Sequence, residues 1–160
     1  MKRTRFYVNF YTYYKHDKGF TRMNQLKLKQ MLQDFMLEDI GDRDITSQAI
    51  FPNDEVGRGV FIAKESGILS GLNIIKEAYQ LLDSTIDVTV HFKDGDKVKA
   101  GATIAEVFGP IAQLLTGERV ILNLIQRMSG IATMTNRCVE ALNDSTIHLS
   151  ATRQTAPRPR

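Results

Sequence analysis

The stretch Gly-Glu-Arg-Val-Ile-Leu-Asn-Leu-Ile-Gln-Arg-Met-Ser-Gly-Ile-Ala-Thr, residues 117–133, decides the fold expected for this chain. Its apolar residues recur at steps of three and four, which predicts a helix with a wide apolar stripe. That stripe comprises Val120, Ile121, Leu124, Ile125, Met128, Ile131 and Ala132. Thr116 is suited to cap the helix, and we expect it to run from about 116 to 142. Ser129-Gly130 predicts close packing or a kink at its middle.

The segments before this helix alternate short helical and strand patterns. Asn24 is suited to cap a helix that ends near Leu37, and a second helix is expected over 72–82. The first helix should bury one face, formed by Leu28, Met31, Leu32, Phe35 and Met36. Strands are expected at 59–63 (buried), 68–71, 86–92 (one face exposed) and 103–108. Asp94-Gly95 predicts a turn, and Gly41 a positive φ in a polar loop.

These patterns predict an α+β fold with three parts after a leading segment. Residues 1–22 form a basic, aromatic extension that we expect to be poorly ordered. Residues 23–115 form the amino-terminal α+β domain, with a small antiparallel sheet and packed helices. Residues 116–143 form the long linking helix. Residues 144–160 begin a further unit, with one strand at about 146–149.

Composition and charge exclude several classes of function. Of the 160 residues, 42% are hydrophobic and 24% are charged, and no run of about 18 apolar residues predicts a membrane span. The net charge of +3 divides into +5 for residues 1–22, +3 for 152–160 and −5 for the middle. The basic residues lie on the ends, so nucleic-acid binding is not expected. The single cysteine, Cys138, fits the cytoplasm and should pack as a small apolar group.

Several residue groups are candidates for reactive or ligand-binding sites. The acidic run 38–44 does not have calcium-loop spacing and favours a solvated loop. None of the three histidines, His91 included, is expected beside a metal-type ligand. Residues 94–107 resemble the hammerhead of biotinyl and lipoyl carrier domains, but no lysine follows on a tight turn, which favours a hairpin-like structural element. Arg119, expected at the helix opening, and Arg153 are suited to grip carboxylates or phosphates, with free helix N–H groups aiding Arg119.

A family resemblance gives these arginines a specific expected role. Residues 37–47, 117–133 and 152–157 resemble segments of quinolinate phosphoribosyltransferases, also called nicotinate-nucleotide pyrophosphorylase (carboxylating). The resemblance implies an α+β amino-terminal domain followed by an α/β barrel, of which 144–160 would supply the first strand. It implies synthesis of nicotinate mononucleotide, for NAD, from quinolinate and phosphoribosyl pyrophosphate, with release of pyrophosphate and carbon dioxide. Magnesium would accompany the pyrophosphate substrate, with no ligands in this chain.

The resemblance also implies a homodimer or higher oligomer, in which one subunit's amino-terminal domain covers the other's barrel mouth. Arg119 would cross that interface to bind the quinolinate carboxylates. Thr152, Arg153 and Gln154 would line the quinolinate pocket, although the family has lysine at the position of Gln154. Ala151 also stands where the family has aspartate, and the tail differs.

A complete barrel needs on the order of 200 residues or more, so we expect a truncated chain that is inactive alone. Two alternatives stay open at this point. One is a non-catalytic interaction or dimerisation module. The other is a molybdenum-transport-associated relative of the same fold.

Overall fold

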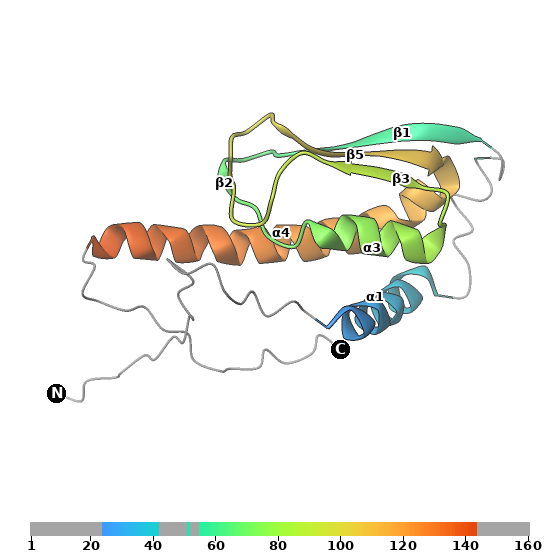
Figure 1. The fold of residues 1–160 in the computed structure, drawn as a ribbon, viewed down its shortest axis with the longest axis horizontal. Coiled ribbons are helices and arrows are strands. Elements are labelled where there is room, and N and C mark those ends of the chain that lie inside the picture. Colours follow the sequence, from blue (N-terminus) through green and yellow to red (C-terminus); the bar gives the residue numbers. More distant parts are fainter. Residues whose placement is uncertain (1–23, 42–50, 52–54, 144–160) are drawn as a thin grey trace. The chain divides into compact units, whose positions relative to one another are not determined.

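A computed structural model describes residues 24–41, 51 and 55–143 (Figure 1). These residues form helices and strands in the order α1 (Gln25–Ile40), β1 (Val56–Ile62), β2 (Gly67–Ile68), α3 (Asn73–Leu82), β3 (Asp87–Val90), β4 (Lys97–Val98), β5 (Thr103–Pro110) and α4 (Ile111–Leu142). Residues 22–136 belong to one compact unit. The extension at 1–22, the strand expected at 146–149 and the start of a barrel lie outside the described residues. The α+β class is confirmed.

The strands form two antiparallel sheets. The larger has the order β1-β5-β3, with β5 in the centre, and the smaller pairs β2 with β4. In Figure 1 the larger sheet lies on one side of α3 and α4, and α1 lies on the other side of these helices. The hairpin-like element expected within residues 94–107 is wrong, because β4 pairs with β2 rather than with β5. The turn at Asp94-Gly95 is confirmed, with φ of +93° at Gly95.

The core lies between the larger sheet and the helices. Its largest fully buried side chains are Tyr79, Leu32, Ile75 and Ile121. The Tyr79 hydroxyl donates to the carbonyl oxygen of Leu114 at 3.1 Å, which satisfies the polar group inside the core. Burial, followed by the charge of Glu118, raises the pKa of Tyr79. The phenol therefore stays neutral and serves packing.

The strand expected to be buried at 59–63 is instead an edge strand. Side chains of β1 alternate between partly buried and exposed along Val56–Ile62, and Val56, Val60 and Ile62 are 46–56% exposed. Helices cover only one face of the larger sheet, so every second residue of β1 lies on the open face. The sequence prediction failed because a short apolar run has the same appearance on an edge strand as on a central one.

One end of each of the helices α1 and α4 differs from the sequence prediction. The Asn24 cap is confirmed, since its side chain accepts from the N–H groups of Leu26 and Lys27. However, α1 continues past Leu37 to Ile40. The buried face of α1 is also narrower than expected and contains Leu28, Leu32 and Met36, while Met31 and Phe35 are exposed.

The α4 helix ends at Leu142 as expected but starts five residues early, at Ile111. Thr116 is not its cap, because the Thr116 hydroxyl donates to the carbonyl oxygen of Ala112 one turn earlier. The N–H of Ile111 donates to the carbonyl oxygen of Glu55 at 2.9 Å, so the chain just before β1 fixes the helix start. That contact joins residues far apart in sequence, which local patterns do not record.

Candidate functional site

Arg119 lies about two turns inside α4 rather than at its opening, since the helix begins at Ile111. The expected help from free helix N–H groups is therefore wrong, because those groups belong to the first four residues of the helix. The backbone at this point is firmly held, since Gly117, Val120 and Ile121 are buried. The Arg119 side chain itself is 74% exposed. It is a guanidinium group directed into solvent from a rigid helix.

Asp39 in the last turn of α1 is the partner of Arg119. Nη1 of Arg119 donates to Oδ1 of Asp39 at 3.4 Å, and the Asp39 side chain is 27% exposed. The solvated loop expected for Asp39 is wrong, because the residue belongs to α1. Acidic residues are unfavourable at a helix C-terminus, and α1 has no basic residue of its own there. Arg119 supplies the missing positive charge from another helix.

Gly41 ends α1 directly after this pair. Its φ is +59°, a region that favours glycine, and its N–H donates to the carbonyl oxygen of Leu37. The positive φ predicted for Gly41 is thus confirmed. Glu38 is exposed, whereas Asp42 and Asp44 lie outside the described residues. The acidic run is therefore split at Gly41, and its described part belongs to a helix end.

Ser129 and Thr133, in the stretch that carried the family resemblance, have a structural role that the sequence analysis missed. The Ser129 hydroxyl accepts from the N–H of Ser70 at 3.0 Å and donates to the same residue's carbonyl oxygen at 3.3 Å. The Thr133 hydroxyl bonds the N–H and carbonyl of Ile68 in the same way, at 2.8 and 3.5 Å. We call this arrangement the hydroxyl clamp. Its two side chains take the place of a neighbouring strand along residues 68–70.

The geometry of the hydroxyl clamp follows from two regular spacings. Four residues of helix rise about 6 Å, and two residues of extended chain rise nearly 7 Å. Hydroxyl groups four residues apart on α4 therefore match backbone groups two residues apart, at Ile68 and Ser70. Glycines at 67 and 71 permit the close approach, because a Cβ at Gly67 would lie 2.6 Å from Oγ1 of Thr133 and one at Gly71 would lie 2.8 Å from the Met128 sulfur. The close packing predicted at Ser129-Gly130 is confirmed for Ser129. Gly130 itself faces open space.

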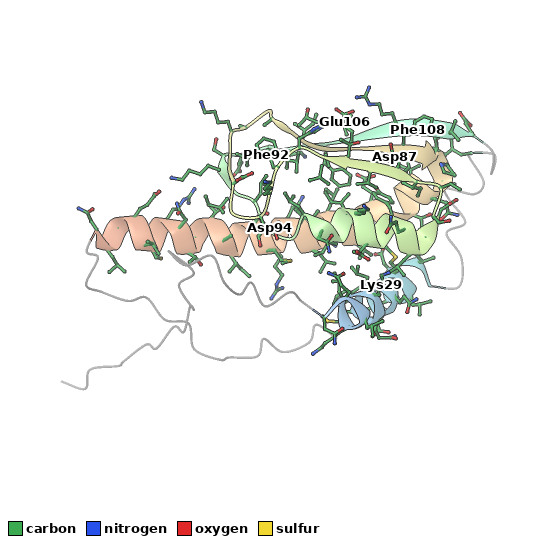
Figure 2. All side chains as sticks on the ribbon, viewed as in Figure 1. Lys29, Asp87, Phe92, Asp94, Glu106 and Phe108 are labelled. Carbon is green, nitrogen blue, oxygen red and sulfur yellow. The ribbon has the colours of Figure 1, made fainter. Side chains whose placement is uncertain are left out.

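A second polar cluster lies on the open face of the larger sheet. Glu106 on β5 forms an ion pair with Arg58 on β1. Oε1 of Glu106 also lies within hydrogen-bonding distance, 3.2 Å, of Nε2 of His91, which follows β3. Hydrogen bonds from Arg58 and then from His91 lower the pKa of Glu106. Figure 2 labels Glu106 together with Phe108, an exposed apolar neighbour on the same strand. The expectation that no histidine would lie beside a metal-type ligand is wrong for His91.

Asp94 is a further residue whose role the sequence did not indicate. Its Oδ1 accepts from the N–H of Leu72 at 2.9 Å, at the start of α3 (Figure 2). No side chain from within α3 caps this helix. The turn in the hammerhead-like segment therefore supplies a cap from elsewhere in the chain, which agrees with its structural reading.

Several other predicted features can be compared with the structure. Within residues 24–41, 51 and 55–143, no three histidine, cysteine, aspartate or glutamate side chains lie together in a way that could hold a metal ion. The described residues thus offer no donor set that fits magnesium. Cys138 is exposed, so its predicted packing is wrong. No helix in the described part of the chain is long and apolar enough to cross a membrane. Thr152, Arg153 and Gln154 lie outside the described residues.

Comparison with known proteins supports the resemblance read from the sequence. The family model described as quinolinate phosphoribosyl transferase, N-terminal domain, matches residues 44–129. The probable nicotinate-nucleotide pyrophosphorylase (carboxylating) of Bacillus subtilis is 51% identical over 135 residues, which are 84% of this chain and 46% of that protein. The protein of the same name from Synechocystis is 39% identical over 79% of this chain and 42% of its own length.

Solved structures agree with the sequence matches. The crystal structure of NadC from Streptococcus pyogenes superposes with a TM-score of 0.74 at 35% identity. The superposed part is 78% of this chain and 45% of the NadC chain. The chain therefore spans about half the length of the relatives it matches. The family model covers more than half of the chain. It includes Arg119 and, of the two hydroxyl-clamp side chains, Ser129 but not Thr133. This chain belongs to the quinolinate phosphoribosyltransferase family, through that family's N-terminal domain.

Proposed function

We propose that this chain supplies the amino-terminal part of a quinolinate phosphoribosyltransferase. In that reaction, quinolinate and phosphoribosyl pyrophosphate give nicotinate mononucleotide, pyrophosphate and carbon dioxide in NAD biosynthesis. The observation that carries the proposal is the match of residues 44–129 to the family's N-terminal domain. We place this function in the cytoplasm, as expected from the sequence. The names of the relatives favour it over the molybdenum-transport-associated alternative.

Within this function, Arg119 binds the carboxylates of quinolinate in the barrel of a neighbouring subunit. The rigid backbone and the 74% exposed side chain support this role, because the guanidinium group extends from the domain surface. A guanidinium group remains charged at any working pH and offers paired N–H donors to a carboxylate. Thr152, Arg153 and Gln154 remain proposed pocket residues. Catalysis also requires the barrel of a family member, which a full-length relative can supply in an experiment.

A mixed-subunit experiment tests this function. The chain is co-expressed with the full-length Bacillus subtilis relative in which the residue aligned with Arg119 is replaced by alanine. We expect the wild-type chain to co-purify with that subunit and to restore nicotinate mononucleotide formation. Arg119→Lys should restore about tenfold less, because lysine keeps the charge but loses the paired donors.

The outcomes of the mixed-subunit experiment separate the parts of the proposal. Without co-purification, the pairing with a full-length subunit is refuted. If the wild-type chain co-purifies without restoring turnover, the role of Arg119 across the interface is refuted. Equal recovery with lysine would contradict paired binding of the carboxylates. Turnover by the 160-residue chain alone would contradict its need for a partner's barrel.

A second candidate function, an interaction module, is favoured by exposed apolar residues on α4. Ile131 and Met134 are 56% and 60% exposed on neighbouring turns. Burying such side chains against another copy is favourable. We therefore expect the purified chain to self-associate, and light scattering after size exclusion measures this. Ile131→Glu should shift the distribution toward monomer. A wild-type monomer at high concentration would count against this candidate.

A further inference from the structure

We propose that Asp39 is the positioning residue for Arg119: its carboxylate holds one arm of the guanidinium group and leaves the remaining donors free for a carboxylate of quinolinate. This inference deepens the proposed function and rests on it. Asp39 does not touch the substrate in this arrangement. It acts only by fixing where Arg119 points.

The geometry divides the guanidinium donors into two groups. Nη1 of Arg119 donates to Oδ1 of Asp39 at 3.4 Å, and the Arg119 side chain remains 74% exposed. A guanidinium group has five N–H donors in one plane. Nη1 is therefore directed to α1, and no acceptor for the other guanidinium donors is shown among the described residues. A planar carboxylate matches two such donors in parallel.

Asp39 is well placed to direct this group because α1 is anchored on both sides of it. Leu32 and Met36 bury one face of the helix in the core, Ile40 packs against the core, and Gly41 ends the helix. Arg119 likewise extends from a buried stretch of α4. An unpaired arginine on the surface samples many rotamers, and ordering them on binding weakens affinity. A fixed acceptor selects the rotamer before the ligand arrives.

The negative charge of Asp39 also repels an anionic ligand, so the two effects oppose each other. Asp39 and a ligand carboxylate would lie on different edges of the guanidinium plane. The Asp39 side chain is 27% exposed, so water and salt partly screen its charge. Asp39 lies in direct hydrogen-bond contact with the guanidinium group, closer than it would lie to a carboxylate bound on another side of that group, so its attraction for Arg119 exceeds its repulsion of the ligand. We therefore expect positioning to dominate, and loss of the Asp39 charge should weaken binding of quinolinate.

The test uses the chain in the mixed-subunit assay of the proposed function. Asp39→Asn keeps the shape but removes the charge, and should raise the KM for quinolinate three- to tenfold while kcat changes less than twofold. Glu38→Gln removes the same charge one residue away, from an exposed side chain, and should leave KM within twofold. In the Arg119→Lys chain, Asp39→Asn should change the KM for quinolinate less than twofold, because lysine has no planar set of paired N–H donors to orient. A lower KM with Asp39→Asn, or equal changes for Glu38→Gln, would overturn the proposal.

A readout independent of activity uses the 160-residue chain alone. Hydrogen exchange at the Nη1 N–H groups of Arg119, followed by NMR, should be at least twofold faster in Asp39→Asn and unchanged in Glu38→Gln. Unchanged exchange in both variants would refute positioning by Asp39, whatever the assay shows. If the wild-type chain restores turnover and Asp39→Asn behaves like it, only this inference fails. If the wild-type chain restores nothing, the proposed function fails first, and NMR still decides whether Asp39 orients Arg119.

Discussion

Replacing Ile121 by alanine is expected to lower the free energy of unfolding by about 2–5 kcal/mol. Ile121 has 0% exposure and belongs to the core cluster between the helices and the larger sheet. Its Cδ1 lies 3.4 Å from the point where a Cβ on Gly117 would sit, so this part of the core is closely packed. Alanine would remove three carbons and leave a cavity that rigid helices fill poorly. Urea unfolding followed by circular dichroism measures the change.

Ile131 supplies the matched control on the same helix. It has the same side chain but is 56% exposed, so Ile131→Ala should change the free energy of unfolding by less than about 0.5 kcal/mol. The comparison separates burial from helix propensity, since both variants gain the same preference for alanine. Equal effects at the two positions would contradict the burial of this face of α4.

Breaking the hydroxyl clamp is expected to have the second large effect. The double variant Ser129→Ala with Thr133→Val should lose about 2–4 kcal/mol, because each change removes the side-chain partner of a part-buried backbone N–H. Valine keeps the volume of threonine, so packing around Gly67 is largely conserved. Urea unfolding measures the total loss. Amide hydrogen exchange at Ile68 and Ser70 should accelerate more than at Val107 in the core.

Thr135→Val is the control for the hydroxyl clamp. Thr135 lies two residues beyond Thr133 on α4 and is partly buried, and no partner for its hydroxyl is shown within the described residues. The same chemical change there should alter stability by less than about 0.5 kcal/mol. If Thr135→Val costs as much as Thr133→Val, the loss comes from the helix itself. The contact with residues 68–70 would then contribute little.

Local patterns predicted the elements better than their ends or exposure. The apolar period predicted α4 and its end at Leu142, and Asn24 predicted the start of α1. These signals lie within one or two turns of the residues they describe. The start of α4 depends on a bond from Ile111 to Glu55, and the exposure of β1 depends on which face the helices cover. Neither the start of α4 nor the exposure of β1 can be predicted from neighbouring residues alone.

The site shows the same division. Sequence indicated Arg119 because guanidinium chemistry and the family resemblance both point to that residue. Asp39, its partner, stands 80 positions earlier and was assigned to a loop. The Arg58–Glu106–His91 cluster was missed because it needs the register of three strands. Ser129 and Thr133 were quoted as family markers, and only their contacts with Ile68 and Ser70 give them a structural role.

By itself, the sequence determined the α+β class, the family and the long helix that carries Arg119. Periodicity and motifs are properties of residues close together in the sequence, so they can be recognised without knowing how the chain packs. Tertiary structure decided where that helix begins, that Arg119 lies inside it rather than at its opening, and that an α1 carboxylate faces the guanidinium group. These are contacts between distant segments. They are set by how the apolar faces of α1, α3 and α4 pack together, and the sequence around Arg119 alone does not show which residues of α1 it meets.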